Sequence, residues 1–133
     1  MIMEWWARYI GLPFEDGGRG PASFDCWGLV RAVYADMLRV HLPSYGEISA
    51  RDLARVARAM REEADEAWIQ VSDPREFDVV KMRSGRGGAA VHVGVMVDSS
   101  RLLHVEVATA SAVVPLRHYS VSGRIVSFWR RVA

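Results

Sequence analysis

Cysteine is almost absent from this chain of 133 residues, which contains only one, Cys26. An internal disulfide and a zinc site built from cysteines alone are therefore excluded. A lone cysteine is either a buried packing residue or a reactive thiol, and composition does not choose between the two. The surroundings of Cys26 in the chain have to decide.

Long apolar runs and an excess of one charge are also missing. No apolar stretch approaches the roughly 18 residues of a membrane span, so we expect no span. Seventeen Lys and Arg nearly balance sixteen Asp and Glu, for a formal charge of +1. This balance disfavours a strongly basic nucleic-acid binder, and we expect no nucleic-acid partner. The N-terminus lacks a basic segment followed by an apolar one, so we expect synthesis in the cytoplasm without a signal peptide.

The order of the predicted elements indicates a single α+β domain over residues 1–133. Apolar residues at helical spacing predict helices over residues 3–10, 25–40 and 51–66. From residue 67 the pattern alternates with period two, and the predicted strands are 68–71, 77–82, 90–97, 101–107, 112–116 and 124–130. We therefore expect N-terminal helices packed on a C-terminal antiparallel sheet of about six strands.

Cys26 falls in the first turn of the predicted helix 25–40, directly after Asp25, a candidate N-cap. The start of a helix offers unpaired N–H groups and positive potential, so we expect the pKa of the thiol to be lowered. The backbone N–H of Cys26 is also a candidate donor to an oxyanion. This position favours a nucleophile over a packing residue.

Two histidines can share one face of the predicted hairpin. His92 and Gly94 alternate with valines in its first strand, and His104 lies in its second. If the turn pairs Val97 with Arg101, Gly94 faces His104 and leaves open space between the two imidazoles, which become diagonal neighbours about 7 Å apart at Cα. A shift by one residue would place the histidines on opposite faces.

A thiol that converges with two histidines has the parts of a nucleophilic site. One imidazole can accept the proton of the thiol, and a polar group behind the base can fix its tautomer. Two other interpretations remain open on the residues alone. The three side chains can be ordinary core residues, or Cys26, His92 and His104 can bind zinc.

At these residues the sequence resembles the NlpC-type cell-wall peptidases, a family of papain-like cysteine hydrolases. The resemblance covers about residues 8–130. Its most specific element is residues 24–30, Phe-Asp-Cys-Trp-Gly-Leu-Val, which resembles the nucleophile motif of the family. The other similar segments are the loop 9–18 and the predicted strand segments 77–80, 92–95, 103–105 and 124–130.

The resemblance implies a papain-like fold with Cys26 as nucleophile, His92 as general base and His104 as the group that orients the base. It also implies hydrolysis of an amide bond in a peptidoglycan stem peptide. We expect neither a cofactor nor a metal.

The resemblance further implies three residues on the substrate side. Asp25 corresponds to an acidic residue that binds a substrate amine. Trp27 stands where the family commonly has Ser, and Phe14 lies near a position that commonly has Tyr. Both departures remove polar groups from the expected substrate side.

The variant motif Asp-Cys-Trp-Gly-Leu-Val also resembles the subgroup found in phage tails and gene transfer agents. This implies a tail-tip component that has other tail proteins as partners and is carried to the periplasm by the particle. The alternative is a catalytically weak or inactive assembly module with the same fold.

Overall fold

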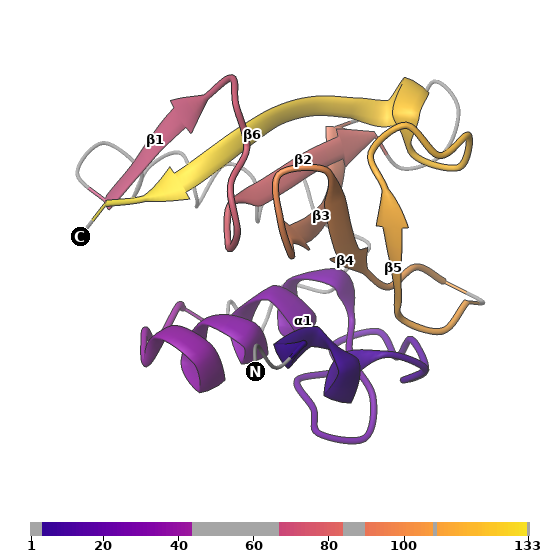
Figure 1. The fold of residues 1–133 in the computed structure, drawn as a ribbon. Helices are drawn as coiled ribbons and strands as arrows, with labels where there is room; N and C mark the ends of the chain where they lie inside the picture. The colour runs from indigo at the N-terminus through magenta and orange to yellow at the C-terminus, as the bar shows by residue number, and fades with distance from the viewer. Residues whose placement is uncertain (1–3, 44–66, 84–89, 108, 133) are drawn as a thin grey trace.

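The computed structural model describes residues 4–43, 67–83, 90–107 and 109–132, and the predicted helix 51–66 lies outside them (Figure 1). The helical part consists of a short 3-10 helix η1 (Trp5–Tyr9), an α-helix α1 (Cys26–Val33) and a π-helical turn η2 (Tyr34–Leu38). The predicted helix 25–40 is thus shorter and changes its winding at Tyr34. It ends at Arg39, whose φ of 56° is left-handed.

Six strands form one antiparallel sheet with the order β1-β6-β2-β3-β4-β5. Their bounds are β1 (Trp68–Val71), β2 (Val79–Arg83), β3 (Ala90–Met96), β4 (Arg101–His104), β5 (Ala112–Pro115) and β6 (Ile125–Arg131). The predicted α+β class and the antiparallel sheet that follows the helical part are confirmed.

Two strands have a bound that differs by two or more residues from the bound that the alternation of the sequence predicts. β2 begins at Val79 and not at residue 77, because Phe77 has a left-handed φ of 72° that a strand cannot contain. β4 ends at His104, and the chain then turns where the backbone N–H of Thr109 donates to the carbonyl of Glu106. The alternation of apolar and polar residues does not predict either of these local bends in the backbone.

The hairpin of β3 and β4 has the predicted register. Val95 pairs with Leu103, and the backbone N–H of Val97 donates to the carbonyl of Arg101 at 3.0 Å. Continuing this register by one residue places Gly94 opposite His104. His92 and His104 therefore lie on the same face of the hairpin.

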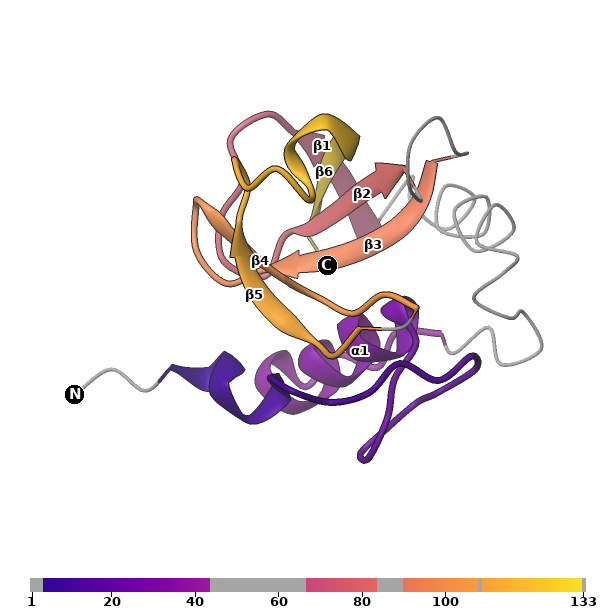
Figure 2. The ribbon, with the colours of Figure 1, turned by 90° about the vertical axis from the view of Figure 1, so that its right-hand side faces the viewer.

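The central strands β2, β3 and β4 have a buried cluster on each face of the sheet. On one face, Val95 and Leu103 belong to the same buried cluster as Leu29 and Val30 of α1, and α1 lies beside β3 and β4 (Figure 2). On the other face, β2, β3 and β4 contribute to a second cluster closed by residues near β5 and β6. Among the described residues, no helix is long and apolar enough to cross a membrane.

Candidate active site

Cys26 is the first residue of α1, and Asp25 caps the helix. The Asp25 carboxylate accepts a hydrogen bond from the backbone N–H of Gly28 at 2.6 Å, which satisfies one of the N–H groups left unpaired at a helix start. The thiol is only 2% exposed and contacts the backbone of Val93 in β3. The start of α1 therefore lies against the strand that carries His92.

The predicted lowering of the thiol pKa is wrong for the protein without substrate. Burial raises the pKa of Cys26 to about 12, and the charge of Asp25 adds to this rise. Hydrogen bonds with the backbone of Val93 and of the first helical turn oppose it without reversing it. Loss of hydration of the thiolate outweighs the potential of the helix start.

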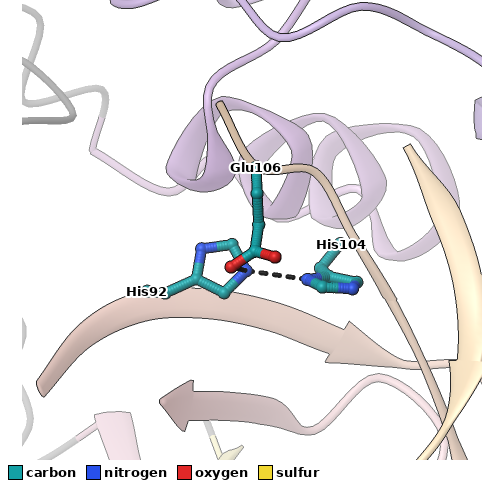
Figure 3. Close-up of side chains that lie close together, drawn as sticks. All are labelled: His92, His104 and Glu106. Atoms are coloured by element: carbon teal, nitrogen blue, oxygen red, sulfur yellow. Dashed lines mark hydrogen bonds and ion pairs between the residues drawn. The ribbon is translucent and has the colours of Figure 1, made fainter. Parts of the chain in front are cut away.

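His92 and His104 form a hydrogen-bonded pair. Nε2 of His92 lies 2.8 Å from Nδ1 of His104, and the two side chains are 4% and 7% exposed (Figure 3). The prediction that the hairpin brings the two imidazoles together is confirmed. They interact directly, without an intervening side chain.

The open space predicted at Gly94 is not present. A Cβ atom at this position would lie 3.0 Å from the carbonyl oxygen of Leu103 and 3.2 Å from Cβ of His104. Gly94 instead allows a close approach of β4 to β3. Because Gly94 has no side chain, the two strands lie close enough for the two imidazoles to make contact. No open space lies between the imidazoles.

Both histidines are neutral near pH 7. Burial, with a smaller effect of His104, lowers the pKa of His92 to about 3, and burial also lowers the pKa of His104. When Nε2–H of His92 donates to Nδ1 of His104, Nδ1 of His92 is the nitrogen that can accept a proton. It lies on the side of the ring that faces away from His104 (Figure 3).

Sequence reasoning missed two charged residues beside this pair. Oε1 of Glu106 lies 3.7 Å from Nε2 of His92, and Arg124 forms a close ion pair with the same carboxylate. One signal for Glu106 was present in the sequence: it lies two residues after His104, so the period-two alternation places both on the same face. Arg124 had no local signal, because the fold brings it from the segment before β6.

His92, His104 and Glu106 also form a group of metal-ligand types, with one donor atom from each within 4.8 Å of the others. Zinc requires ligand lone pairs directed at the metal. Here the two ring nitrogens are bonded to each other, and Arg124 already holds the carboxylate. This pairing fits a proton relay better than a metal centre.

Asp25 is buried and occupied by contacts within the protein. Besides capping α1, its carboxylate accepts from Arg19 at 2.7 Å and from the backbone N–H of Gly17 at 3.2 Å. It therefore ties the loop before α1 to the first turn of the helix. Its predicted contact with a substrate amine stays a prediction.

Trp27 and Phe14 both pack in the buried cluster beside α1, but they differ in exposure. Trp27 is buried among core residues, and its indole N–H donates to the carbonyl of Pro43 at 2.8 Å. Phe14 is half-buried and pairs with Phe24 through an isolated bridge. Of the two, Phe14 is the more accessible to a ligand.

Comparison with known proteins places this geometry in a family. Residues 11–130 match the NlpC/P60 family. Murein DD-endopeptidase MepH of Escherichia coli (strain K12) is 29% identical over 128 residues, which cover 90% of this chain and 43% of the relative. A probable endopeptidase of Haemophilus influenzae is 27% identical over 104 residues, covering 78% of this chain and 56% of the relative. The chain thus spans about half the length of these two relatives.

A solved structure agrees with the sequence match. The NlpC/p60 domain of the peptidoglycan hydrolase SagA has a TM-score of 0.61 to this chain at 21% identity, and the alignment covers 95% of this chain and 91% of that domain. This likeness supports the fold. Because the family match extends over nearly the whole chain, the protein belongs to the NlpC/P60 family.

Proposed function

We propose that this chain is a cysteine endopeptidase that hydrolyses amide bonds in the stem peptides of peptidoglycan. The observation that carries the proposal is the buried His92–His104 pair on a strand whose backbone contacts the Cys26 thiol. The names of the relatives, a murein endopeptidase and a probable endopeptidase, support the same chemistry.

The reaction begins with a proton transfer. The Cys26 thiol gives its proton to Nδ1 of His92, while Nε2–H of His92 remains bonded to His104. The resulting thiolate attacks the substrate carbonyl, and the Cys26 backbone N–H stabilises the oxyanion. The His92 imidazolium then protonates the departing amine, which leaves a thioester on Cys26. Water activated by neutral His92 hydrolyses this thioester and regenerates the thiol.

The raised thiol pKa gives this mechanism a specific resting state. With the pKa of Cys26 near 12 and that of His92 near 3, both groups are neutral before substrate binds. The thiolate is therefore formed together with the imidazolium, as a pair whose opposite charges stabilise each other.

We propose Asp25, Trp27 and Phe14 as residues of the substrate side. Phe14 would contact the ligand directly, since it is the most accessible of the three. Asp25 and Trp27 are 1% and 2% exposed, so their influence would come chiefly from shaping the loop and the first turn around Cys26.

Digestion of purified sacculi tests the activity. Wild-type protein should release muropeptides that mass spectrometry identifies as products of stem-peptide cleavage. Cys26→Ala should lower the rate by about a thousandfold or more, as loss of a nucleophile does in related triads. His41→Ala, at an exposed histidine that takes part in none of these contacts, should keep wild-type activity. Equal release by Cys26→Ala and wild type would contradict the proposal.

The second candidate is a catalytically weak or inactive assembly module with the same fold. The nearly complete burial of Cys26 and its raised pKa favour this alternative. It predicts that reduced wild-type protein releases no muropeptides and that Cys26→Ala leaves assembly of its complex unchanged.

For the biological setting, we propose delivery as a tail-tip component of a phage or gene transfer agent, together with other tail proteins and with action in the periplasm. Only the resemblance of residues 25–30 supports this setting. Immunogold labelling of purified particles tests it: label at the tail tip is expected, and particles without label would contradict it.

A further inference from the structure

A carboxylate lies beside the histidine pair and has no part in the mechanism described so far. Glu106 follows β4, and its Oε1 lies 3.7 Å from Nε2 of His92. At this separation the carboxylate interacts with His92 by charge and not by a hydrogen bond. His92 gains a positive charge only when it accepts a proton, so the interaction is strongest in that state.

Contacts hold both the backbone and the carboxylate of Glu106 in position. Its backbone carbonyl accepts from the hydroxyl and the N–H of Thr109, at 2.9 and 3.1 Å. Its carboxylate is held by Arg124. The guanidinium of Arg124 in turn donates to the carbonyl oxygens of Arg83 at 2.8 Å and Ser120 at 3.0 Å.

Arg124 is itself well shielded, with a side chain that is 15% exposed, against 29% for Glu106. Partly buried charges that are fixed by several hydrogen bonds lose less of their interaction to solvent than surface pairs do. The Glu106 carboxylate is therefore a preorganised negative group beside His92, not a mobile surface charge.

We propose that Glu106 is a positioning residue that stabilises the protonated form of His92, and that Arg124 holds the carboxylate in place for this role. The proposal rests on the proposed function, because it concerns the imidazolium formed when His92 takes the proton of Cys26. No bond forms or breaks at Glu106. Its negative charge raises the fraction of molecules in which the Cys26 thiolate and the His92 imidazolium are both present.

The charges around His92 explain why such a group is needed. Burial and the neighbouring His104 and Arg124 all lower the pKa of His92, and Glu106 is the group that raises it. The thiolate of Cys26, on the side of α1, adds a second negative charge after proton transfer. Without Glu106, the Cys26 thiolate would be the one negative charge among these groups that stabilises the imidazolium. His104 and Arg124 would both still disfavour it.

The test is the rate at which iodoacetamide alkylates Cys26 near neutral pH, because this rate follows the fraction of thiolate. Loss of an opposite charge within about 4–6 Å commonly shifts a pKa by at least about one unit, so Glu106→Gln should slow alkylation about tenfold. Glu106→Asp keeps the charge and should restore most of the rate. Glu15→Gln, on an exposed residue of the loop before α1, should match wild type.

Two results would overturn the proposal. One is an alkylation rate for folded Glu106→Gln equal to that of wild type. The other is an equal slowing by Asp and Gln, which would assign Glu106 a role of shape and not of charge. If thermal unfolding shows that Glu106→Gln is not folded, Glu106→Ala replaces it: slower alkylation is expected because the negative charge beside His92 is lost, and an unchanged rate would overturn the proposal.

The alkylation assay also separates this proposal from the proposed function. A protein that cleaves no muropeptide but shows the charge-dependent slowing retains the Glu106 effect and loses the peptidase assignment. A protein that cleaves muropeptides but reacts equally fast with and without the Glu106 charge retains the peptidase assignment and loses the Glu106 effect.

Discussion

At the scale of a single residue, Asp25 connects the loop before α1, the helix and Cys26, the proposed nucleophile. One carboxylate caps α1 through Gly28, pairs with Arg19 and accepts from Gly17. Cys26 is the next residue in the chain. The position of Cys26 against β3 therefore depends on the Asp25 carboxylate, which is almost inaccessible to solvent.

Asp25→Ala should reduce the free energy of unfolding by about 3 kcal/mol, since it removes a helix cap and one side of a buried ion pair. Asp25→Asn keeps a capping oxygen and loses the charge, so its loss should be smaller. Urea denaturation measures both, with Glu15→Ala as an exposed control from the same loop. A loss below about 0.5 kcal/mol for the alanine variant would show that the contacts of Asp25 do not hold the loop to the helix.

The candidate site could be predicted in part from single residues. Period-two alternation was enough to place His92 and His104 on one face, because their pairing depends only on register. The pKa of Cys26 could not be predicted, since it depends on how tightly α1 packs on β3. Glu106 shares the alternation of His104, but its meaning depends on Arg124, which only the folded chain brings near.

At the scale of elements, the loop before α1 and the helix meet at two glycines. A Cβ atom on Gly28 would lie 2.0 Å from the carbonyl oxygen of Gly18. Backbone cannot move aside as a flexible side chain can. The motif Asp-Cys-Trp-Gly therefore needs glycine at its fourth position for packing.

Gly28→Ala should destabilise the protein by about 2 kcal/mol or more, although alanine is the better helix former by about 1 kcal/mol. Thermal or urea unfolding measures the loss. Gly123→Ala, where a Cβ atom would meet nothing within 4 Å, is the matched control and should leave stability nearly unchanged. A more stable Gly28→Ala protein would mean that the loop and helix are not in this close contact.

The bounds of the strands could be predicted only in part from the sequence. The six predicted strands all appear, but β2 starts late at the left-handed Phe77, and β4 ends early where Glu106 and Thr109 close a turn. Such bends depend on local hydrogen bonds that apolar periodicity does not contain. The predicted helix 51–66 stays a prediction.

For the whole molecule, the buried neutral histidines link stability to pH. In the unfolded chain a histidine binds a proton near pH 6.5, whereas in the folded protein His92 does so only near pH 3. Between these values the unfolded state binds more protons. Stability is therefore fully present above about pH 6.5 and falls as the pH decreases towards 3.

The free energy of unfolding should fall by up to about 1.4 kcal/mol per pH unit for this one group. Comparing wild type with His92→Gln from about pH 7 to pH 4 isolates the contribution, because the other titrating groups remain in both proteins. The variant should show the shallower slope. Parallel curves would indicate that His92 is not held neutral by burial.

The membership of the NlpC/P60 family and the α+β fold apply to the chain as a whole, whereas the peptidase activity is a proposal built on Cys26. The chain has one cysteine, so any thiol modification acts at one known atom. This makes a quantitative comparison of modification and activity possible without a variant.

The most direct measurement is the release of muropeptides from sacculi as a function of the fraction of Cys26 alkylated, with that fraction determined by intact-protein mass spectrometry. Activity should fall in proportion to alkylation and disappear when modification is complete. Cleavage that continues with fully alkylated Cys26 would contradict the assignment of this thiol as the nucleophile.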